Sequence, residues 1–119
     1  MPSLEGRAIL VVEDEPLVAL DIHRTFQDAG ARVISARMRT QALEAVSSRE
    51  VSAAVLDLVL ADDSEDLRRE PTDRGIPYVI YSGMPKPPDE RNVFIEKPAG
   101  SDRLVTAIED ALKTAPGVA

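Results

Sequence analysis

A single carboxylate interrupts a strongly apolar segment of this sequence. Residues 55–60 read VLDLVL, and Asp57 is the only charged residue among them. Stripping water from a lone carboxylate costs several kcal/mol, which is comparable to the whole stability of a small domain. We therefore expect Asp57 either to compensate a nearby charge or to perform chemistry. Taken alone, it could also be an ordinary strand-end residue that caps the next loop.

The ends of three other apolar runs also carry residues that could do chemistry. These are Glu13 and Asp14 after residues 7–12, Ser82 and Gly83 after residues 77–81, and Lys97 after residues 93–95. Ligands of a doubly wound sheet gather beyond the carboxyl ends of its strands, so we expect these side chains to meet there. Several carboxylates in one crevice repel one another unless a hard divalent cation and an ammonium lie among them. The acidic cluster therefore predicts a magnesium site.

Short apolar runs alternate with segments of helical periodicity along the chain. The runs predict strands buried on both faces at residues 7–12, 31–36, 51–56, 77–81 and 93–95. The periodic segments predict helices at residues 16–28, ended by Gly30, at 40–48, capped by Thr40, and at 101–113, capped by Ser101. Residues 62–70 predict at most a short, exposed helix. This alternation predicts a parallel sheet with helices on both faces.

Length and composition exclude several classes of protein. A chain of 119 residues is expected to form one domain. The formal net charge of −7 argues against direct binding to nucleic acid, which depends on lysine and arginine. Because the chain has no cysteine, it has no disulfide framework and no thiolate metal site. It also lacks a bilayer-spanning apolar stretch and a signal-peptide pattern, so we expect a soluble, cytoplasmic protein without a membrane partner.

Four motifs in a fixed order make the sequence resemble a known family. They are LVVEDEP at residues 10–16, VLDLVL at 55–60, YSGM at 81–84 and IEKP at 95–98. In this combination the chain resembles the receiver domain of two-component response regulators, over nearly its whole length. The resemblance implies one receiver domain over residues 1–119, with a flavodoxin-like, doubly wound, five-stranded parallel sheet of strand order 2-1-3-4-5.

The resemblance also implies a role for each carboxylate and for the lysine. Asp57 would be the phosphoacceptor, and Lys97 would pair with the phosphoryl group once it is formed. Glu13, Asp14 and Asp57 would hold Mg²⁺ together with the backbone carbonyl of Val59. These roles are physically reasonable, because phosphoryl transfer needs mainly positioning and neutralisation of the phosphoryl oxygens.

A conformational switch is implied as well. In the family, the residue at the position of Ser82 moves toward the phosphoryl oxygens, and an aromatic residue on the fifth strand turns into the vacated space. Phe94 occupies that position here, and because it lacks the hydroxyl of tyrosine we expect it to be buried and inward-facing. The implied function is a phosphoacceptor in a two-component system or phosphorelay, with possible self-dephosphorylation but no enzymatic turnover of a substrate.

The implied partners are proteins. A sensor histidine kinase or a phosphotransfer protein would supply the phosphoryl group, and a downstream protein that the sequence does not name would read the result. The oligomeric state is left open, with a homodimer through the first or last helix as one alternative. No nucleic acid partner is expected.

The sequence departs from the family between Ser82 and Lys97. Once the expected strand at 93–95 is set aside, residues 83–92 (GMPKPPDERN) leave ten positions, three of them proline. A crossover helix between parallel strands normally needs a dozen or more residues, and proline interrupts helical hydrogen bonding. We therefore expect the fourth helix to be absent or reduced to a turn. Because no DNA-binding or enzymatic output domain follows, we expect a stand-alone, single-domain regulator; an excised module of a larger protein would look the same.

Two alternative functions follow from the same residues. A pseudo-receiver would use this fold to bind proteins without phosphorylation, and the shortened segment at 83–92 favours that alternative. A phosphatase of the haloacid-dehalogenase type would need Asp-x-Asp after the first strand. The candidate nucleophile here follows the third strand and has Val59 two residues later, so we rank the phosphatase last.

Overall fold

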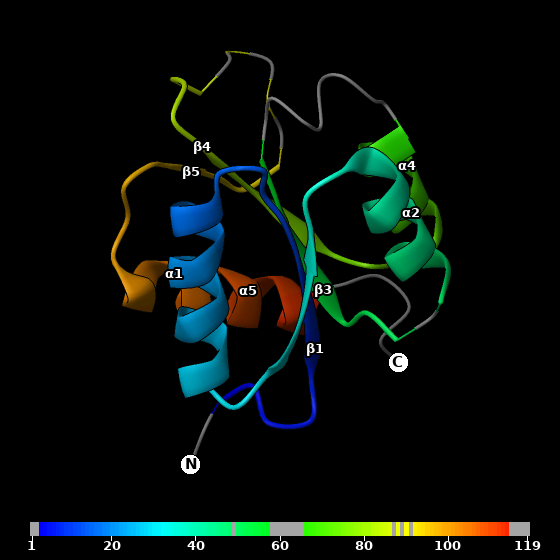
Figure 1. Ribbon diagram of the computed structural model, residues 1–119, viewed down its shortest axis with the longest axis horizontal. Coiled ribbons are helices and arrows are strands. Elements are labelled where there is room, and N and C mark those ends of the chain that lie inside the picture. The colour runs from blue at the N-terminus through cyan, green and yellow to red at the C-terminus, as the bar shows by residue number, and fades with distance from the viewer. Residues whose placement is uncertain are drawn as a thin grey trace.

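Five parallel strands form one sheet in the order β2-β1-β3-β4-β5 (Figure 1). The computed structural model describes residues 3–48, 50–57, 66–86, 88, 90 and 92–114. The strands are β1 (Ala8–Val12), β2 (Arg32–Ala36), β3 (Ala53–Leu56), β4 (Tyr78–Ser82) and β5 (Phe94–Glu96). This order confirms the predicted doubly wound, flavodoxin-like architecture. The strand order reverses at β1, so the cleft beyond the carboxyl ends of β1 and β3 is where such sheets bind ligands.

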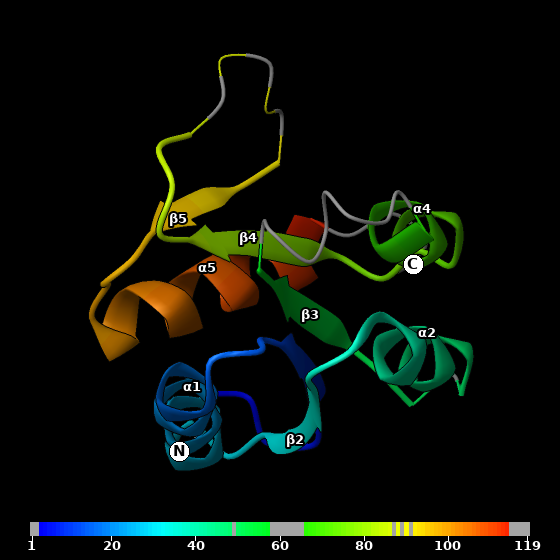
Figure 2. The ribbon, with the colours of Figure 1, turned by 45° about the horizontal axis from the view of Figure 1, so that its top comes forward.

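Helices cover both faces of the sheet (Figure 2). They are α1 (Pro16–Asp28), α2 (Arg39–Ser47), α4 (Asp66–Asp73), which connects β3 to β4, and α5 (Ser101–Thr114). α1 and α5 lie on one face, whereas α2 and α4 lie on the other. Within the part of the chain that the structure describes, no helix is long and apolar enough to cross a lipid bilayer.

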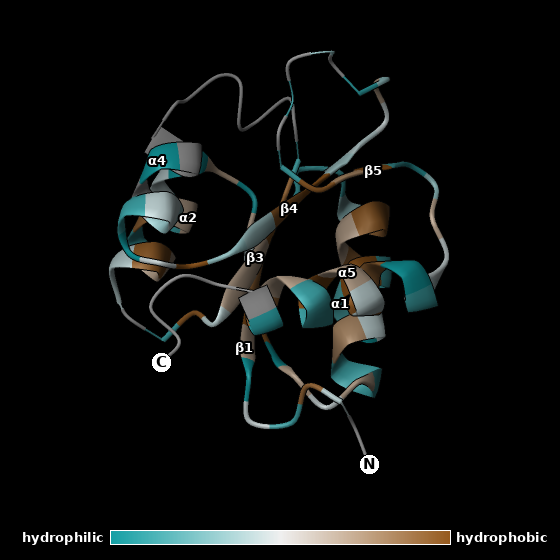
Figure 3. Cartoon of the chain, turned by 180° about the vertical axis from the view of Figure 1, so that it is seen from behind, coloured by the Kyte–Doolittle hydropathy of each residue, from teal (hydrophilic) through white to brown (hydrophobic). Residues whose placement is uncertain are grey.

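The core is split by the sheet into two layers because successive strand residues point to opposite faces. In β1, Ile9 and Val11 pack toward α1 and α5, whereas Leu10 and Val12 pack toward α2. All five residues of β1 are buried, as expected for a central strand covered on both sides. Coloured by hydropathy, β4 and β5 each contain hydrophobic stretches beside paler, more polar ones (Figure 3).

The first helix begins and ends where the sequence predicts. Pro16 is its first residue, where the missing N–H of proline costs no hydrogen bond, and Gly30 follows its end with φ +93°. That φ favours glycine over any residue with a side chain. Ile22 and Phe26 are buried, whereas Leu17 and Leu20 on the same helix are exposed.

The two other predicted helix caps are wrong. α2 begins at Arg39, so Met38 is its N-cap and Thr40 lies inside the first turn. α5 begins at Ser101 itself, and the carbonyl of Gly100 accepts the first hydrogen bonds, from the N–H groups of Arg103 and Leu104. The observed cap lies two residues before the predicted one in α2 and one residue before it in α5.

The connection between β4 and β5 has no helix at its described residues, 83–86, 88, 90 and 92–93. The predicted absence of a helix between β4 and β5 is therefore confirmed for these positions. The helix labelled α4 is a different one, which precedes β4. Both flanking strands begin and end one residue later than predicted, and their last residues, Ser82 of β4 and Glu96 of β5, pair with each other. Val59 and residues 62–65 lie outside the described residues.

Candidate functional site

The carboxyl ends of β1 and β3 carry the two acidic residues that the structure brings closest to Lys97. Val12 and Leu56 are the last paired residues of these strands, so Glu13 and Asp57 follow them side by side. Backbone hydrogen bonds continue the sheet through both positions, from Asp57 N–H to the Val12 carbonyl at 3.0 Å and from Glu13 N–H to the Ala36 carbonyl at 3.1 Å. Both side chains therefore start from fixed backbone.

Lys97 bridges these two carboxylates. Its Nζ donates a hydrogen bond to Asp57 Oδ2 at 2.9 Å and a second one to Glu13 Oε1. Glu13 and Asp57 are only 2% and 7% exposed, so the ammonium compensates charge that is largely shielded from water. The backbone N–H of Lys97 is itself fixed by a 2.6 Å hydrogen bond to the Ser82 carbonyl. Asp57 thus has the compensating charge that its apolar sequence context requires.

Burial and neighbouring charges have opposing effects on the pKa values of Glu13 and Lys97. Burial raises the pKa of Glu13 above its usual value; the hydrogen bond from Lys97 opposes this rise, and the nearby Asp57 reinforces it. For Lys97, burial lowers the pKa, but the hydrogen bonds to Glu13 and Asp57 outweigh burial and raise it. The ammonium is therefore held in its charged form by two carboxylates that share it.

Three carboxylates at this rim could hold one cation. Glu13, Asp14 and Asp57 each offer an oxygen, and these oxygens all lie within 4.8 Å of one another. Opposite ligands of Mg²⁺ are about 4.2 Å apart, twice its metal–oxygen distance. The donor set, all oxygen and all anionic, therefore fits a hard divalent cation after small side-chain movements. Asp14 is exposed, which leaves the group open to solvent on one side. The predicted carbonyl ligand Val59 lies outside the described residues.

The two residues assigned to a switch lie on neighbouring strands: Ser82 is the last residue of β4, and Phe94 is the first residue of β5. Ser82 is buried, and its Oγ accepts a hydrogen bond from the N–H of Met84 at 3.0 Å. Phe94 is half-buried against the hydrophobic layer on the α2 and α4 side. It is thus less buried than predicted, because no helix covers β5 at the described residues of the β4–β5 connection.

Sequence reasoning missed Tyr81, the residue before Ser82. Its ring centroid lies 5.5 Å from Lys97 Nζ, and its hydroxyl accepts a hydrogen bond from the Ala99 N–H at 3.0 Å. Two signals in the sequence could have drawn attention to it. Tyrosine occurs only twice in the chain, and strand alternation places residue 81 on the face opposite residue 80 at the rim.

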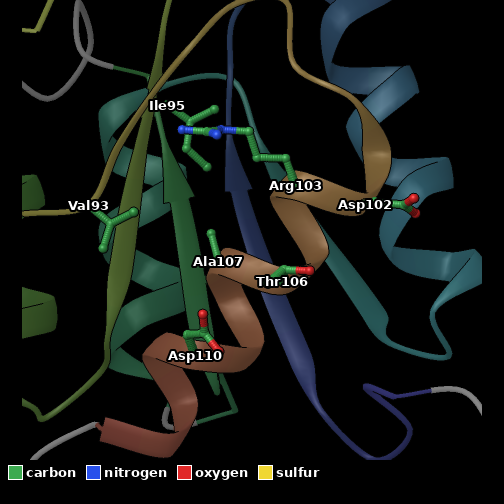
Figure 4. Close-up of a pocket in the computed structure, with 7 residues that line it drawn as sticks. All are labelled: Val93, Ile95, Asp102, Arg103, Thr106, Ala107 and Asp110. Atoms are coloured by element: carbon green, nitrogen blue, oxygen red, sulfur yellow. The ribbon is translucent and has the colours of Figure 1, made fainter.

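A groove of about 420 Å³ lies elsewhere, between β5 and α5 (Figure 4). Val93 and Ile95 form its wall on the strand side, and Arg103 extends from α5 toward them. Two aspartates on α5, Asp102 and Asp110, also line it. None of the clustered carboxylates contributes to this groove, so the candidate site is the acidic rim.

One curated relative matches half of the chain. No protein-family model matches. The phyllosphere-induced regulator PhyR of Methylorubrum extorquens is 41% identical over 61 residues, which cover 50% of this chain and 23% of that protein. The chain therefore spans only a minor part of the relative that it matches.

Solved structures with the same fold include receiver domains of response regulators and of a sensor histidine kinase. PhyR of Brucella abortus superimposes with a TM-score of 0.76 at 28% identity, covering 93% of this chain and 50% of that one. The receiver domain of Erythrobacter litoralis PhyR has a TM-score of 0.81 at 24% identity and covers 98% of both chains. The receiver domain of a Pseudomonas aeruginosa sensor histidine kinase, which has a magnesium ion in its active-site cleft, has a TM-score of 0.79 at 21% identity over 92% of this chain and 99% of that one.

Proposed function

Because this chain is a response-regulator receiver domain, we propose that Asp57 accepts a phosphoryl group and that its phosphorylation alters binding to a partner protein. The observation that carries the proposal is the bridge from Lys97 to the buried Glu13 and Asp57, with Asp14 close enough to complete a cation site. A donor with a phosphorylated histidine, from a sensor histidine kinase or a phosphotransfer protein, would supply the group.

The proposed reaction is a displacement at phosphorus. An oxygen of Asp57 forms a bond to phosphorus while the bond from phosphorus to the donor's imidazole nitrogen breaks, and the imidazole keeps the electron pair. Lys97 compensates the added negative charge from the position in which it already contacts Asp57. Ser82, at the end of the neighbouring strand, would then contact the phosphoryl oxygens.

The proposed metal ligands are Glu13, Asp14 and Asp57, with the Val59 carbonyl as a further ligand. Mg²⁺ bound there would neutralise oxygens of the transferred group. The magnesium ion in the active-site cleft of the Pseudomonas receiver domain supports this part of the proposal by analogy.

A direct experiment separates this function from a phosphorylation-independent role. We expect acetyl phosphate with Mg²⁺ to add the mass of one phosphoryl group to the intact protein, and chelation of Mg²⁺ to prevent it. Asp57→Asn should abolish the mass increase, whereas Asp28→Asn, which changes an exposed aspartate at the end of α1, should leave it unchanged. A mass increase that survives in Asp57→Asn would contradict the proposal.

The pseudo-receiver is the second candidate, and one observation favours it. The described residues between β4 and β5 form no helix, so the face that includes β5 and α5 differs from that of a complete receiver. A wild-type protein that gains no mass under these conditions, and that binds its partner no more and no less tightly than the Asp57→Asn variant does, would support the pseudo-receiver.

A further inference from the structure

Tyr81 contacts the loop after β5 at two points. Its hydroxyl accepts a hydrogen bond from the N–H of Ala99, at 3.0 Å, and its ring centroid lies 5.5 Å from Lys97 Nζ. The side chain is only 5% exposed, so both contacts form away from bulk water. One residue of β4 therefore contacts both the backbone and the ammonium of the segment that carries Lys97.

Neighbouring residues of β4 hold this segment at two successive positions. The Ser82 carbonyl accepts from the Lys97 N–H, and the Tyr81 hydroxyl accepts from the Ala99 N–H. A lysine side chain is long and flexible, so fixed backbone alone does not place its ammonium. The face of an aromatic ring attracts a cation, and this attraction favours the conformers of Lys97 in which Nζ lies above Tyr81 and between the two carboxylates.

We propose that Tyr81 is a positioning residue that acts through Lys97. By fixing the loop through its hydroxyl and the ammonium through its ring, it keeps Lys97 directed at Asp57 and so speeds phosphorylation there. The inference rests on the proposed function, because Lys97 must act on the phosphoryl group for its placement to affect a rate. Misplacement of a catalytic group by a fraction of an ångström to an ångström is known to slow reactions severely.

A purely structural role is the competing explanation. Tyr81 also belongs to the hydrophobic layer on the α1 and α5 side, together with Ile95, Leu104 and Ile108. Packing in this layer needs the ring but not the hydroxyl, because the hydroxyl is hydrogen-bonded to the Ala99 N–H. A variant that keeps the ring and removes the hydroxyl therefore distinguishes positioning from packing.

Tyr78 provides a matched control on the same strand. Its hydroxyl accepts a hydrogen bond from Asn92 Nδ2 at 3.1 Å, and its side chain packs on the opposite face of the sheet. Tyr81→Phe and Tyr78→Phe thus each remove one tyrosine hydroxyl and the hydrogen bond that it accepts. We expect Tyr81→Phe to slow phosphorylation of Asp57 by acetyl phosphate at saturating Mg²⁺ on the order of tenfold. Tyr78→Phe should leave the phosphorylation rate within about twofold of the wild-type rate. Both variants should unfold at similar temperatures, because each loses one hydrogen bond of the same kind.

The tyrosine spectrum tests the contact independently of phosphorylation. The sequence has two tyrosines and no tryptophan, so Tyr81 is the only tyrosine chromophore in the Tyr78→Phe variant. In that background, Lys97→Met removes the ammonium from the ring face and should shift the near-ultraviolet tyrosine band. Exposed Lys86→Met should not shift it.

The two measurements separate failure of the inference from failure of the proposed function. A wild-type protein that acetyl phosphate does not phosphorylate contradicts the proposed function, and the spectral comparison then decides whether Tyr81 senses Lys97. An unshifted band after Lys97→Met overturns the inference. Equal phosphorylation rates in the wild type and Tyr81→Phe, or an equal slowing by Tyr78→Phe, overturn it as well.

Discussion

At the scale of single residues, the site is governed by one ammonium shared between two carboxylates. Glu13 and Asp57 are buried and Lys97 is mostly buried, so each charge depends on the others for compensation. Removing the shared ammonium costs more than forming the group contributes, because two buried carboxylates are then left without a compensating charge. The free energy of unfolding of site variants therefore tests how these charges compensate one another.

Lys97→Met should destabilise the protein by about 2–3 kcal/mol in the absence of divalent cations, somewhat less than a fully buried pair because Asp14 leaves the site open on one side. Adding Mg²⁺ should recover part of the loss, because a cation then compensates the same carboxylates. Urea denaturation with and without Mg²⁺ measures both effects. Lys86→Met, at an exposed lysine, is the control and should change stability little. A Lys97→Met variant as stable as the wild type without Mg²⁺ would refute the shared-ammonium interpretation.

Glu13→Gln should stabilise the protein increasingly as the pH rises. Burial raises the pKa of Glu13 above its usual 4.5, so folding favours the protonated acid. That contribution is fully present below pH 4.5 and is lost as the pH rises through the raised pKa of the folded state. Glutamine does not ionise, so it avoids the cost of burying a charge. Melting temperatures compared at pH 4.5 and about pH 7.5 without Mg²⁺ should show a larger advantage of the variant at the higher pH. Glu44→Gln, at an exposed position on α2, should show no such trend.

Residue types at strand ends sufficed to predict that Glu13, Asp57 and Lys97 meet. Parallel strands all end at one rim, so a chemical group after each strand is enough to place it there. The contact of Tyr81 with Lys97 and Ala99 could not be predicted in the same way. It depends on the path of the loop after β5, and neither residue spacing nor apolar periodicity determines that path.

At the scale of elements, the positions of strands and helices were predictable but their exact ends were not. β4 and β5 are each shifted by one residue toward the C-terminus relative to the prediction, so that Ser82 pairs with Glu96 at their ends. Side-chain caps were inferred for α2 and α5 from residue type alone. In the structure both helices begin at or before the inferred cap, so Thr40 and Ser101 lie within the first turn.

The hydroxyl of Ser101 contributes to packing of α5 against α1. Its Oγ lies 3.2 Å from Thr25 Oγ1, which itself donates to the Asp21 carbonyl at 2.9 Å, so Ser101 acts as the donor of the first contact. In a double-mutant cycle, Ser101→Ala and Thr25→Val should show a coupling energy of about 0.5 kcal/mol, because each removes the other's partner. Chemical denaturation of the four proteins measures it. Additive losses would instead indicate that Ser101 stabilises its helix without Thr25.

At the scale of the whole molecule, the sheet has a strong centre and a weak edge. β1 and β3 pair on both sides and are fully buried, whereas β5 is a three-residue strand that pairs only with β4 in the described part of the chain. Counting residues between Ser82 and Lys97 predicted correctly that the described residues of this connection form no helix, since too few positions and too many prolines remained. What counting could not predict is that Phe94 is left half-buried at this edge.

Hydrogen exchange should report this gradient of stability. The Val93 carbonyl and the Lys97 N–H bond to β4, so alternation along a parallel strand directs the N–H groups of Phe94 and Glu96 outward. We expect these two amides to exchange at least about a thousandfold faster than those of β1, which open only on global unfolding. Mg²⁺ should slow exchange in β1 in proportion to the stability it adds and leave the two edge amides nearly unchanged, because they exchange without unfolding. Strong protection at Phe94 and Glu96 would instead contradict an open edge, and protection that weakens on dilution would identify a second copy of this protein as the cover.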